Sequence, residues 1–188
     1  MLKIKSTLFK GLMLLVLTCL AADKPKLMKM KVNDQITVSV PRDWHPMDAM
    51  DFTQRYPSVR APLAAYTDAD RQVDFSVNIS ATQWPDTNHE IAKQFFKASL
   101  RNMFDQVTFL QEGVREVNKK KFIYFEIESR MNGNQRQEGQ RDAIGKYTYI
   151  QYYLEPGRTL VFSFNAPRRM KDDWRETADD MMKRIKIK

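Results

Sequence analysis

The sequence predicts an α+β fold, a sandwich in which helices cover a mostly antiparallel sheet. Several segments alternate apolar and polar residues with a period of two, which is typical of strands with one covered face. The segments 88–104 and 171–185 instead repeat apolar residues at helical spacing, so each predicts an amphipathic helix. Elements with one apolar face are stable when those faces pack together in layers, and we expect a single domain over 35–188.

The composition is that of a folded protein and excludes several kinds of site. Hydrophobic residues make up 43% of the 188 residues, which is enough for a core. One cysteine and two histidines cannot build a zinc ribbon, a haem-attachment motif or a disulfide framework. No Gly-x-Ser-x-Gly motif is present, and six glycines leave little room for a phosphate-binding loop. We therefore expect no cofactor, no metal and no recognisable catalytic motif.

Residues 1–22 have the three parts of a secretory signal peptide. Lys3, Lys5 and Lys10 come first, an apolar run follows over 11–17, and small residues end the segment. The apolar stretch is shorter than the about 20 residues that a membrane-spanning helix needs. We predict an exported protein that is periplasmic or otherwise associated with a bacterial envelope.

Two processing routes fit this N-terminus. Signal peptidase would cut after Ala21, because Cys19 and Ala21 are the small residues that it requires. That cut removes three lysines and the cysteine, and lowers the net charge from +8 to +5. In the alternative route Cys19 is lipidated, and this lipid anchor would be the protein's contact with the membrane. An exported protein rarely meets nucleic acid, so we expect no nucleic-acid partner.

The first part of the remaining chain predicts strands around one short helix. Residues 23–34 are lysine-rich without an apolar period and predict a flexible lead-in. A half-buried strand follows over 36–40, ended by a proline, and a weak helical pattern covers 47–55. Two further strands, 63–67 and 72–81, flank a polar turn.

The rest of the chain predicts strands between two long helices. Thr87 and Glu90 have the spacing of a capping box, which would start the helix over 88–104. In the last helix Asp179 and Lys183 are four residues apart, as are Asp180 and Arg184, and this spacing predicts two ion pairs. A proline–glycine pair suits a type II turn between the last two strands. The predicted strands cover 107–110, 114–117, 122–128, 146–154 and 159–165.

Two groups of side chains are candidate sites. Glu126 and Glu128 share a strand face with Tyr124, and a carboxylate pair beside a tyrosine can carry out acid–base chemistry. This group predicts, as an alternative function, a small envelope hydrolase or lyase. The other group consists of aromatic and basic residues expected at the surface, where they would bind a protein or a small ligand: Trp44, Arg136, Tyr147 and Tyr149.

A family resemblance follows from the order and spacing of these elements. It rests on the opening Ile36–Trp44, a strand followed by a proline and a tryptophan, and on the run from Val117 to Ile187. That run has a basic turn, aromatic strands, a Pro-Gly turn and a closing helix. The chain resembles the PsbP/Mog-type fold, which includes the bacterial DcrB-like envelope proteins. The resemblance implies an α/β/α sandwich that serves as a non-enzymatic binding, accessory or assembly factor, and it carries over no functional residue.

Overall fold

The computed structural model describes residues 24–55, 61–82, 84, 88–131 and 144–188. The predicted signal peptide with Cys19, and also Arg136, lie outside these residues. Antiparallel strands dominate the described chain and three α-helices accompany them, so the predicted α+β fold with a mostly antiparallel sheet is confirmed.

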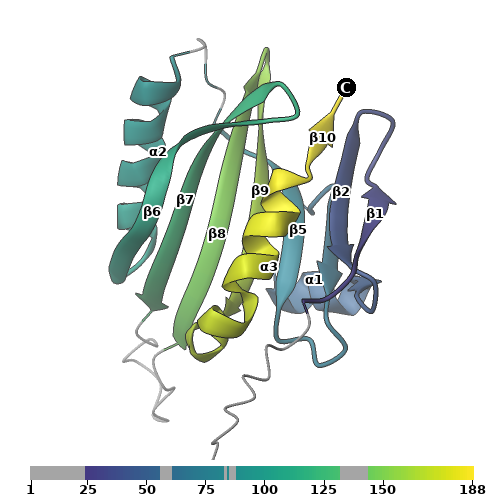
Figure 1. Cartoon of the computed structure of the whole chain (residues 1–188). Coiled ribbons are helices and arrows are strands. Elements are labelled where there is room, and N and C mark those ends of the chain that lie inside the picture. The colour runs from purple at the N-terminus through teal and green to yellow at the C-terminus, as the bar shows by residue number, and fades with distance from the viewer. Residues whose placement is uncertain (1–23, 56–60, 83, 85–87, 132–143) are drawn as a thin grey trace, which may run out of the picture.

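The main sheet has seven strands in the order β3-β4-β5-β9-β8-β7-β6 (Figure 1). Every neighbouring pair in it is antiparallel. β6 therefore forms one edge of the sheet, and the short β3 forms the other. The strands are β3 (His45–Pro46), β4 (Ala64–Thr67), β5 (Asp74–Ile79), β6 (Gln106–Val117), β7 (Lys120–Met131), β8 (Ile144–Glu155) and β9 (Arg158–Pro167).

A second, smaller sheet pairs β1 (Leu27–Lys31) and β10 (Lys186–Ile187) with β2 (Ile36–Pro41). The flexible lead-in predicted over 23–34 is therefore wrong, because β1 lies inside that stretch. Met28 and Met30 alternate there with Lys29 and Lys31 as in a strand, but the alternation is too short to stand out in a lysine-rich stretch, and Met30 packs against the core. Pairing with β2, which the sequence pattern does not show, makes this segment a strand.

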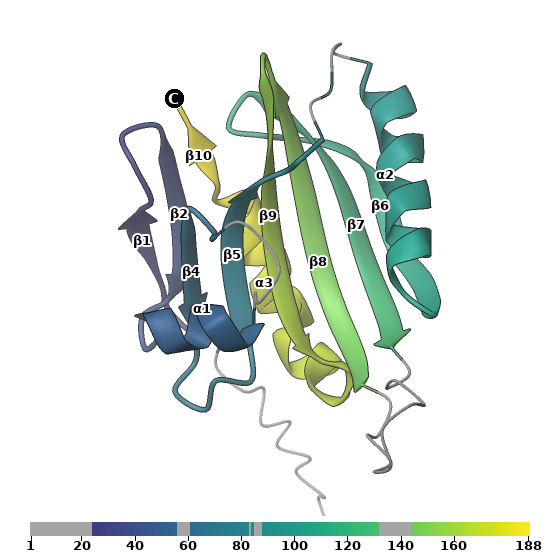
Figure 2. The ribbon, with the colours of Figure 1, turned by 180° about the vertical axis from the view of Figure 1, so that it is seen from behind.

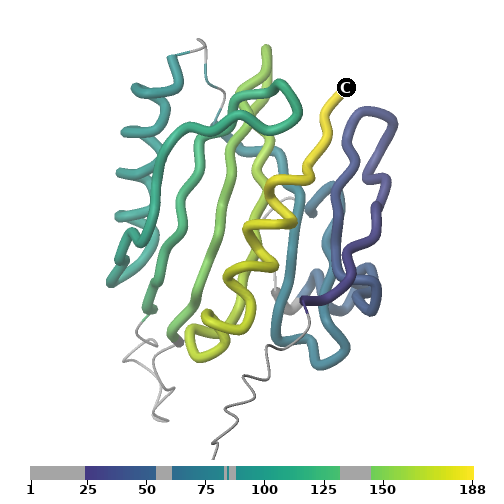
Figure 3. The backbone as a smooth tube through the Cα atoms, viewed as in Figure 1, coloured from purple at the N-terminus to yellow at the C-terminus, as the bar shows by residue number. Residues whose placement is uncertain are grey.

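The strands predicted over 107–110 and 114–117 are one strand, β6, whose register shifts at a bulge after Phe109. A bulge bends a strand and interrupts its alternation, so the sequence predicted two strands here. β6 joins β7 through Asn118 and Lys119, which both have positive φ, 49° and 66°. Figure 3 shows this turn beside the segment that follows the last helix.

The three predicted helices are present: α1 (Ala49–Arg55), α2 (His89–Met103) and α3 (Lys171–Lys183). The cap of α2 differs from the prediction. The side-chain oxygen of Asn88 accepts a hydrogen bond from the backbone N–H of Ile91 at 3.1 Å, so Asn88 is the N-cap. Thr87, the predicted cap, lies outside the described residues. An asparagine at this position satisfies an N–H that the helix itself leaves free.

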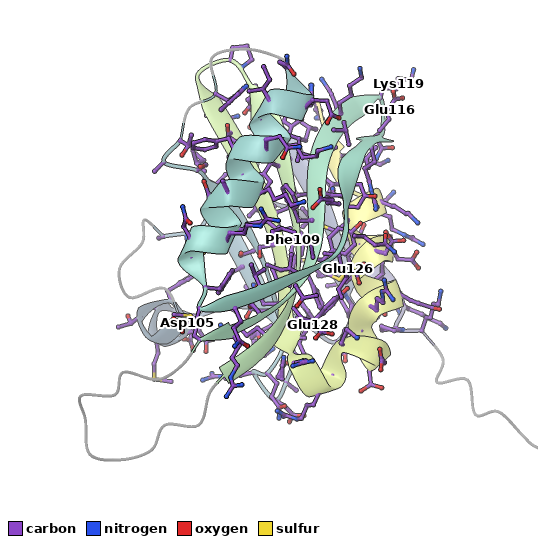
Figure 4. All side chains as sticks on the ribbon, turned by 90° about the vertical axis from the view of Figure 1, so that its left-hand side faces the viewer. Asp105, Phe109, Glu116, Lys119, Glu126 and Glu128 are labelled. Atoms are coloured by element: carbon purple, nitrogen blue, oxygen red, sulfur yellow. The ribbon has the colours of Figure 1, made fainter. Side chains whose placement is uncertain are left out.

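α2 and α3 pack on opposite faces of the main sheet (Figures 2 and 4). This follows from the alternation along β7, where Phe122 belongs to the core under α3 and Ile123 to the core under α2. The buried helix residues are Ala92, Phe96 and Leu100 on α2, and Thr177, Ala178, Met181 and Met182 on α3.

Candidate functional site

Three of the four predicted binding residues are buried. Trp44 is 4% exposed, Tyr147 0% and Tyr149 2%, so the prediction that they lie at the surface is wrong. Both tyrosines belong to the core that α3 covers, and the rings of Trp44 and Trp174 lie 5.4 Å apart. Alternation along a strand shows which side chains share a face, but not which face a helix will cover. Arg136, the fourth residue, lies outside the described residues.

Glu126 and Tyr147 meet beneath α3. The Glu126 side chain is 3% exposed, and its carboxylate accepts a hydrogen bond from the Tyr147 hydroxyl at 3.0 Å. The same carboxylate binds Arg175 of α3 through Nε at 2.6 Å and Nη2 at 3.1 Å. Burial, and then the charge of Glu126, raise the pKa of Tyr147. The tyrosine hydroxyl is therefore a fixed hydrogen-bond donor and not a proton-transfer group at neutral pH.

Glu128 lies two residues further along β7, at the N-terminal end of α3 (Figure 4). Its carboxylate lies 2.8 Å from Lys171 Nζ and 2.7 Å from Arg168 Nε. The hydrogen bond from Lys171 holds the pKa of Glu128 below its ordinary value, against the opposing effect of burial, and Arg168 adds to the lowering. A general acid at neutral pH needs a raised pKa, so this carboxylate does not suit that role.

Arg115 of β6 joins the same interface further along α3. Its guanidinium lies 2.8 Å from Asp179 and 4.0 Å from the centre of the Tyr124 ring, and the Tyr149 hydroxyl donates to Asp179 at 3.2 Å. The predicted ion pair of Asp179 with Lys183 is confirmed, whereas the predicted pair of Asp180 with Arg184 is wrong, since Arg184 lies beyond the last residue of α3 and the two do not pair in the described chain. Burial would raise the pKa of Asp179, but the hydrogen bonds from Arg115 and Lys183 outweigh it and the pKa is lowered.

These contacts form what we call the α3 ladder, three ion pairs between one side of the helix and the sheet. They are Lys171–Glu128, Arg175–Glu126 and Asp179–Arg115. The sequence pattern singled out the two glutamates and Asp179, but it gave no indication of the roles of Arg115, Lys171 and Arg175. The four-residue spacing of Lys171, Arg175 and Asp179 was a signal for a charged stripe, yet a stripe of charge is usually solvated and not paired with a sheet.

A polar pocket of about 370 Å³ opens beside the α3 ladder. Carboxylates and cations line it together, and its charged groups are paired with one another or, for Glu176, with Lys24. Its lining residues are Gln111, Arg115, Glu126, Tyr149, Arg175, Glu176, Asp179 and Lys183. Such an arrangement holds α3 on the sheet, and it offers neither a free base nor an activated nucleophile.

Within the described ranges, no group of three or more His, Cys, Asp or Glu side chains is placed to hold a metal ion. Among the helices of the described residues, none has both the length and the apolarity needed to cross a bilayer.

Comparison with solved structures identifies the fold. The chain is similar to the cyanobacterial PsbP (CyanoP) of Synechocystis, with a TM-score of 0.59 and 12% identity over 91% of this chain and 98% of that one. It is also similar to the Ran-binding protein Mog1 of Saccharomyces cerevisiae, with a TM-score of 0.54 and 12% identity over 87% and 96% of the two chains.

A third similar structure is LpqN of Mycobacterium tuberculosis, described as involved in cell envelope biogenesis. Its TM-score is 0.54, with 14% identity over 86% of this chain and 90% of that one. No family model matches the sequence, and no curated protein matches it either. The three likenesses confirm that the chain has a PsbP/Mog-like fold.

Proposed function

We propose that this protein is a non-enzymatic, exported component of a bacterial envelope that acts by binding a partner, as an accessory or assembly factor. One observation carries the proposal. Glu126, Glu128, Tyr147 and Tyr149, the carboxylates and tyrosines best suited to catalysis, are all paired within the protein beneath α3. Their partners belong to the scaffold, so these residues stabilise the fold.

The similar structures support the same proposal. One is named as a Ran-binding protein and another is described as involved in cell envelope biogenesis, so this fold is used in binding and in the envelope. The proposal includes the α/β/α sandwich and the likeness to DcrB-like proteins that the sequence resemblance implies. The partner in this proposal is a protein or a small ligand.

Export is tested by fractionation of a bacterial host that expresses the full-length chain. We expect a product without residues 1–21 in the soluble periplasm, or a membrane-bound product acylated at Cys19, and an intact-mass measurement distinguishes them. A Cys19→Ser variant would release the second product from the membrane and leave the first unchanged. An uncleaved chain in the cytoplasm would overturn the proposed localisation.

Binding is tested by site-specific photocrosslinking in the same cells. A photoreactive residue replaces one exposed side chain at a time, and we expect discrete adducts from a contiguous set of positions. Glu128→Gln, introduced into the reactive variant, should give the same adducts, because a carboxylate with a structural role is not needed for binding. Absence of adducts at every position, or a substrate turned over by the wild type and not by a folded Glu128→Gln variant, would overturn the proposal.

A further inference from the structure

A second pocket, with a volume of about 270 Å³, lies where the small sheet meets the C-terminal end of α3. β2 and β10 lie next to this end of the helix in Figure 1. The residues that line the pocket are Leu27, Lys29, Thr37, Ser39, Asn118, Lys183, Arg184 and Lys186. We call it the basic pocket, because four of these eight residues are cations and none is acidic.

Strand pairing brings part of this lining together. Lys29 pairs with Ser39 across β1 and β2, and Lys186 pairs with Thr37 across β10 and β2. Residues directly opposite each other in an antiparallel pair project from the same face, so both lysines lie beside the hydroxyl groups. Ser39 is only 5% exposed, which places it deep in the pocket.

The chain that follows α3 completes the lining. Lys183 and Arg184 end the helix, and Lys186 follows them into β10. The side-chain amide of Asn118, from the β6–β7 turn, donates a hydrogen bond to the Ile185 carbonyl at 2.7 Å. This bond ties the turn to the end of the helix, so the site is built by three separate parts of the fold.

The basic pocket differs from the α3 ladder in how its charges are satisfied. In the ladder every cation faces a carboxylate. In the basic pocket only Lys183 has an acidic partner, Asp179, and Lys29, Arg184 and Lys186 form no ion pair with any described residue. Donor groups that converge without an acceptor have the arrangement expected of an anion site.

The dipole of α3 explains only part of this cluster. Lysine and arginine are favoured near a helix C-terminus, which accounts for Lys183 and Arg184 without any ligand. Lys29 and Lys186 belong to the small sheet and have no such reason to be there. The partial negative charge of a helix end is about half an elementary charge, so the three cations without an acidic partner among the described residues still leave a positive pocket.

We propose that the basic pocket binds a phosphate group, either of a soluble phosphorylated molecule or of an anionic phospholipid headgroup. Arginine offers a planar pair of donors that matches a phosphate, the lysines add charge, and the serine and threonine hydroxyls donate further hydrogen bonds. The inference rests on the proposed binding function and names the chemistry of one ligand. The volume suits a headgroup-sized anion and excludes a folded protein as the occupant of the pocket itself.

The test compares two double variants of the full mature chain that lose the same charge. Arg184→Gln/Lys186→Gln alters the basic pocket, and Arg130→Gln/Lys146→Gln alters exposed cations of β7 and β8 near the opposite end of α3. Inorganic phosphate is titrated at constant ionic strength and followed by NMR chemical shifts. Vesicles of phosphatidylcholine with and without phosphatidylglycerol are used in a sedimentation assay.

We expect saturable binding of phosphate, of phosphatidylglycerol vesicles, or of both. The pocket variant should bind at least about tenfold more weakly, since it loses charge-assisted hydrogen bonds, and the control variant should bind like the wild type. Binding of phosphate alone identifies a soluble ligand, and binding of the anionic vesicles alone identifies a lipid headgroup.

Two results would overturn the inference. One is that neither phosphate nor the anionic vesicles bind saturably. The other is that both double variants weaken binding equally, which would reveal an effect of net charge. Unfolding midpoints of all variants are measured first, and Lys29→Gln/Lys186→Gln, which loses the same charge, replaces the pocket variant if the latter is unfolded. Because these assays use purified protein, a negative result leaves the crosslinking test of the proposed function intact.

Discussion

Replacing Glu126 by glutamine is expected to destabilise the protein by about 2 kcal/mol. The Glu126 carboxylate is buried and forms an ion pair with Arg175 Nε at 2.6 Å, and it accepts hydrogen bonds from Arg175 Nη2 at 3.1 Å and from the Tyr147 hydroxyl at 3.0 Å. Glutamine keeps an oxygen that can accept from the Tyr147 hydroxyl, but it removes the charge that faces Arg175. Its NH2 group is a hydrogen-bond donor and would face the guanidinium of Arg175, which also only donates.

The magnitude follows from the exposure of the two partners. Hydrogen bonds to charged groups contribute about 1.5–3 kcal/mol each, and a neutral bond about 1 kcal/mol. Arg175 is 43% exposed, so water compensates for part of its lost partner. These values leave a net loss of about 2 kcal/mol, which corresponds to a fall in Tm of about 4–8 °C for a domain of this size.

Urea unfolding followed by tryptophan fluorescence measures this loss. Trp44 and Trp174 lie in the core and report on its disruption. Glu176→Gln is the matched control, since it removes one carboxylate that lines the same pocket, but this side chain is 72% exposed and its ion-pair partner among the described residues is Lys24. The control should unfold at nearly the same urea concentration as the wild type, because water and salt screen an exposed ion pair. If Glu126→Gln were as stable as this control, the α3 ladder would not hold the helix on the sheet.

Three further predictions concern the edge strand, its turn and the response to pH. Gly113→Ala places a methyl carbon 3.0 Å from Tyr124 Cε1, and the displaced ring should cost about 1–2 kcal/mol in urea unfolding. Asn118→Ala should cost about 1–2 kcal/mol, because alanine tolerates φ of 49° poorly and cannot make the asparagine's hydrogen bond. Glu128 and Asp179 have lowered pKa values, so their stabilisation is present above their ordinary values of 4.5 and 3.8 and is lost as the pH falls through the lowered ones. Urea midpoints measured from pH 7 downwards test this, and Glu128→Gln should flatten the decline.

Each of these predictions has a control. Gly145→Ala places its methyl carbon at an ordinary distance of 3.4 Å from Arg168 Cβ, so a loss equal to that of Gly113→Ala would contradict the steric argument. Asn118→Gly keeps the backbone conformation accessible and should cost less than Asn118→Ala. An unfolding midpoint of Glu128→Gln that declines in acid as steeply as that of the wild type would contradict the assignment to this carboxylate.

The elements that the sequence predicted well are those whose side chains repeat with a clear period. The helices over 88–104 and 171–185 were located within a few residues, because an apolar stripe three or four residues apart has no other common explanation. β1 was missed, since its alternation covers only four residues of a lysine-rich stretch, and β6 was predicted as two strands because its bulge breaks the alternation. Both errors have the same origin, which is that pairing between strands leaves little trace in one strand's sequence.

The sequence predicted several residues of the candidate site, but it did not predict which of them are buried. The sequence correctly placed Glu126 and Glu128 on one strand face, where the structure has them pointing to α3. It also predicted Trp44, Tyr147 and Tyr149 as exposed, and all three are buried. These residues are buried because α3, which follows β9, packs over their face of the sheet. The alternation of the strands does not show which face a helix will cover.

The sequence by itself determined which side chains share a face of each helix and strand, because the periods of 2 and 3.6 residues are fixed by the backbone. Only the tertiary structure decided which of those faces would be buried and which charges would find partners. Arg115 and Asp179 are separated by 64 positions in the chain and meet at 2.8 Å, and Lys29 and Lys186 lie near opposite ends of the described chain yet line one pocket. Such contacts depend on how separate elements dock, and docking is set by the sum of many packed surfaces and not by any local pattern.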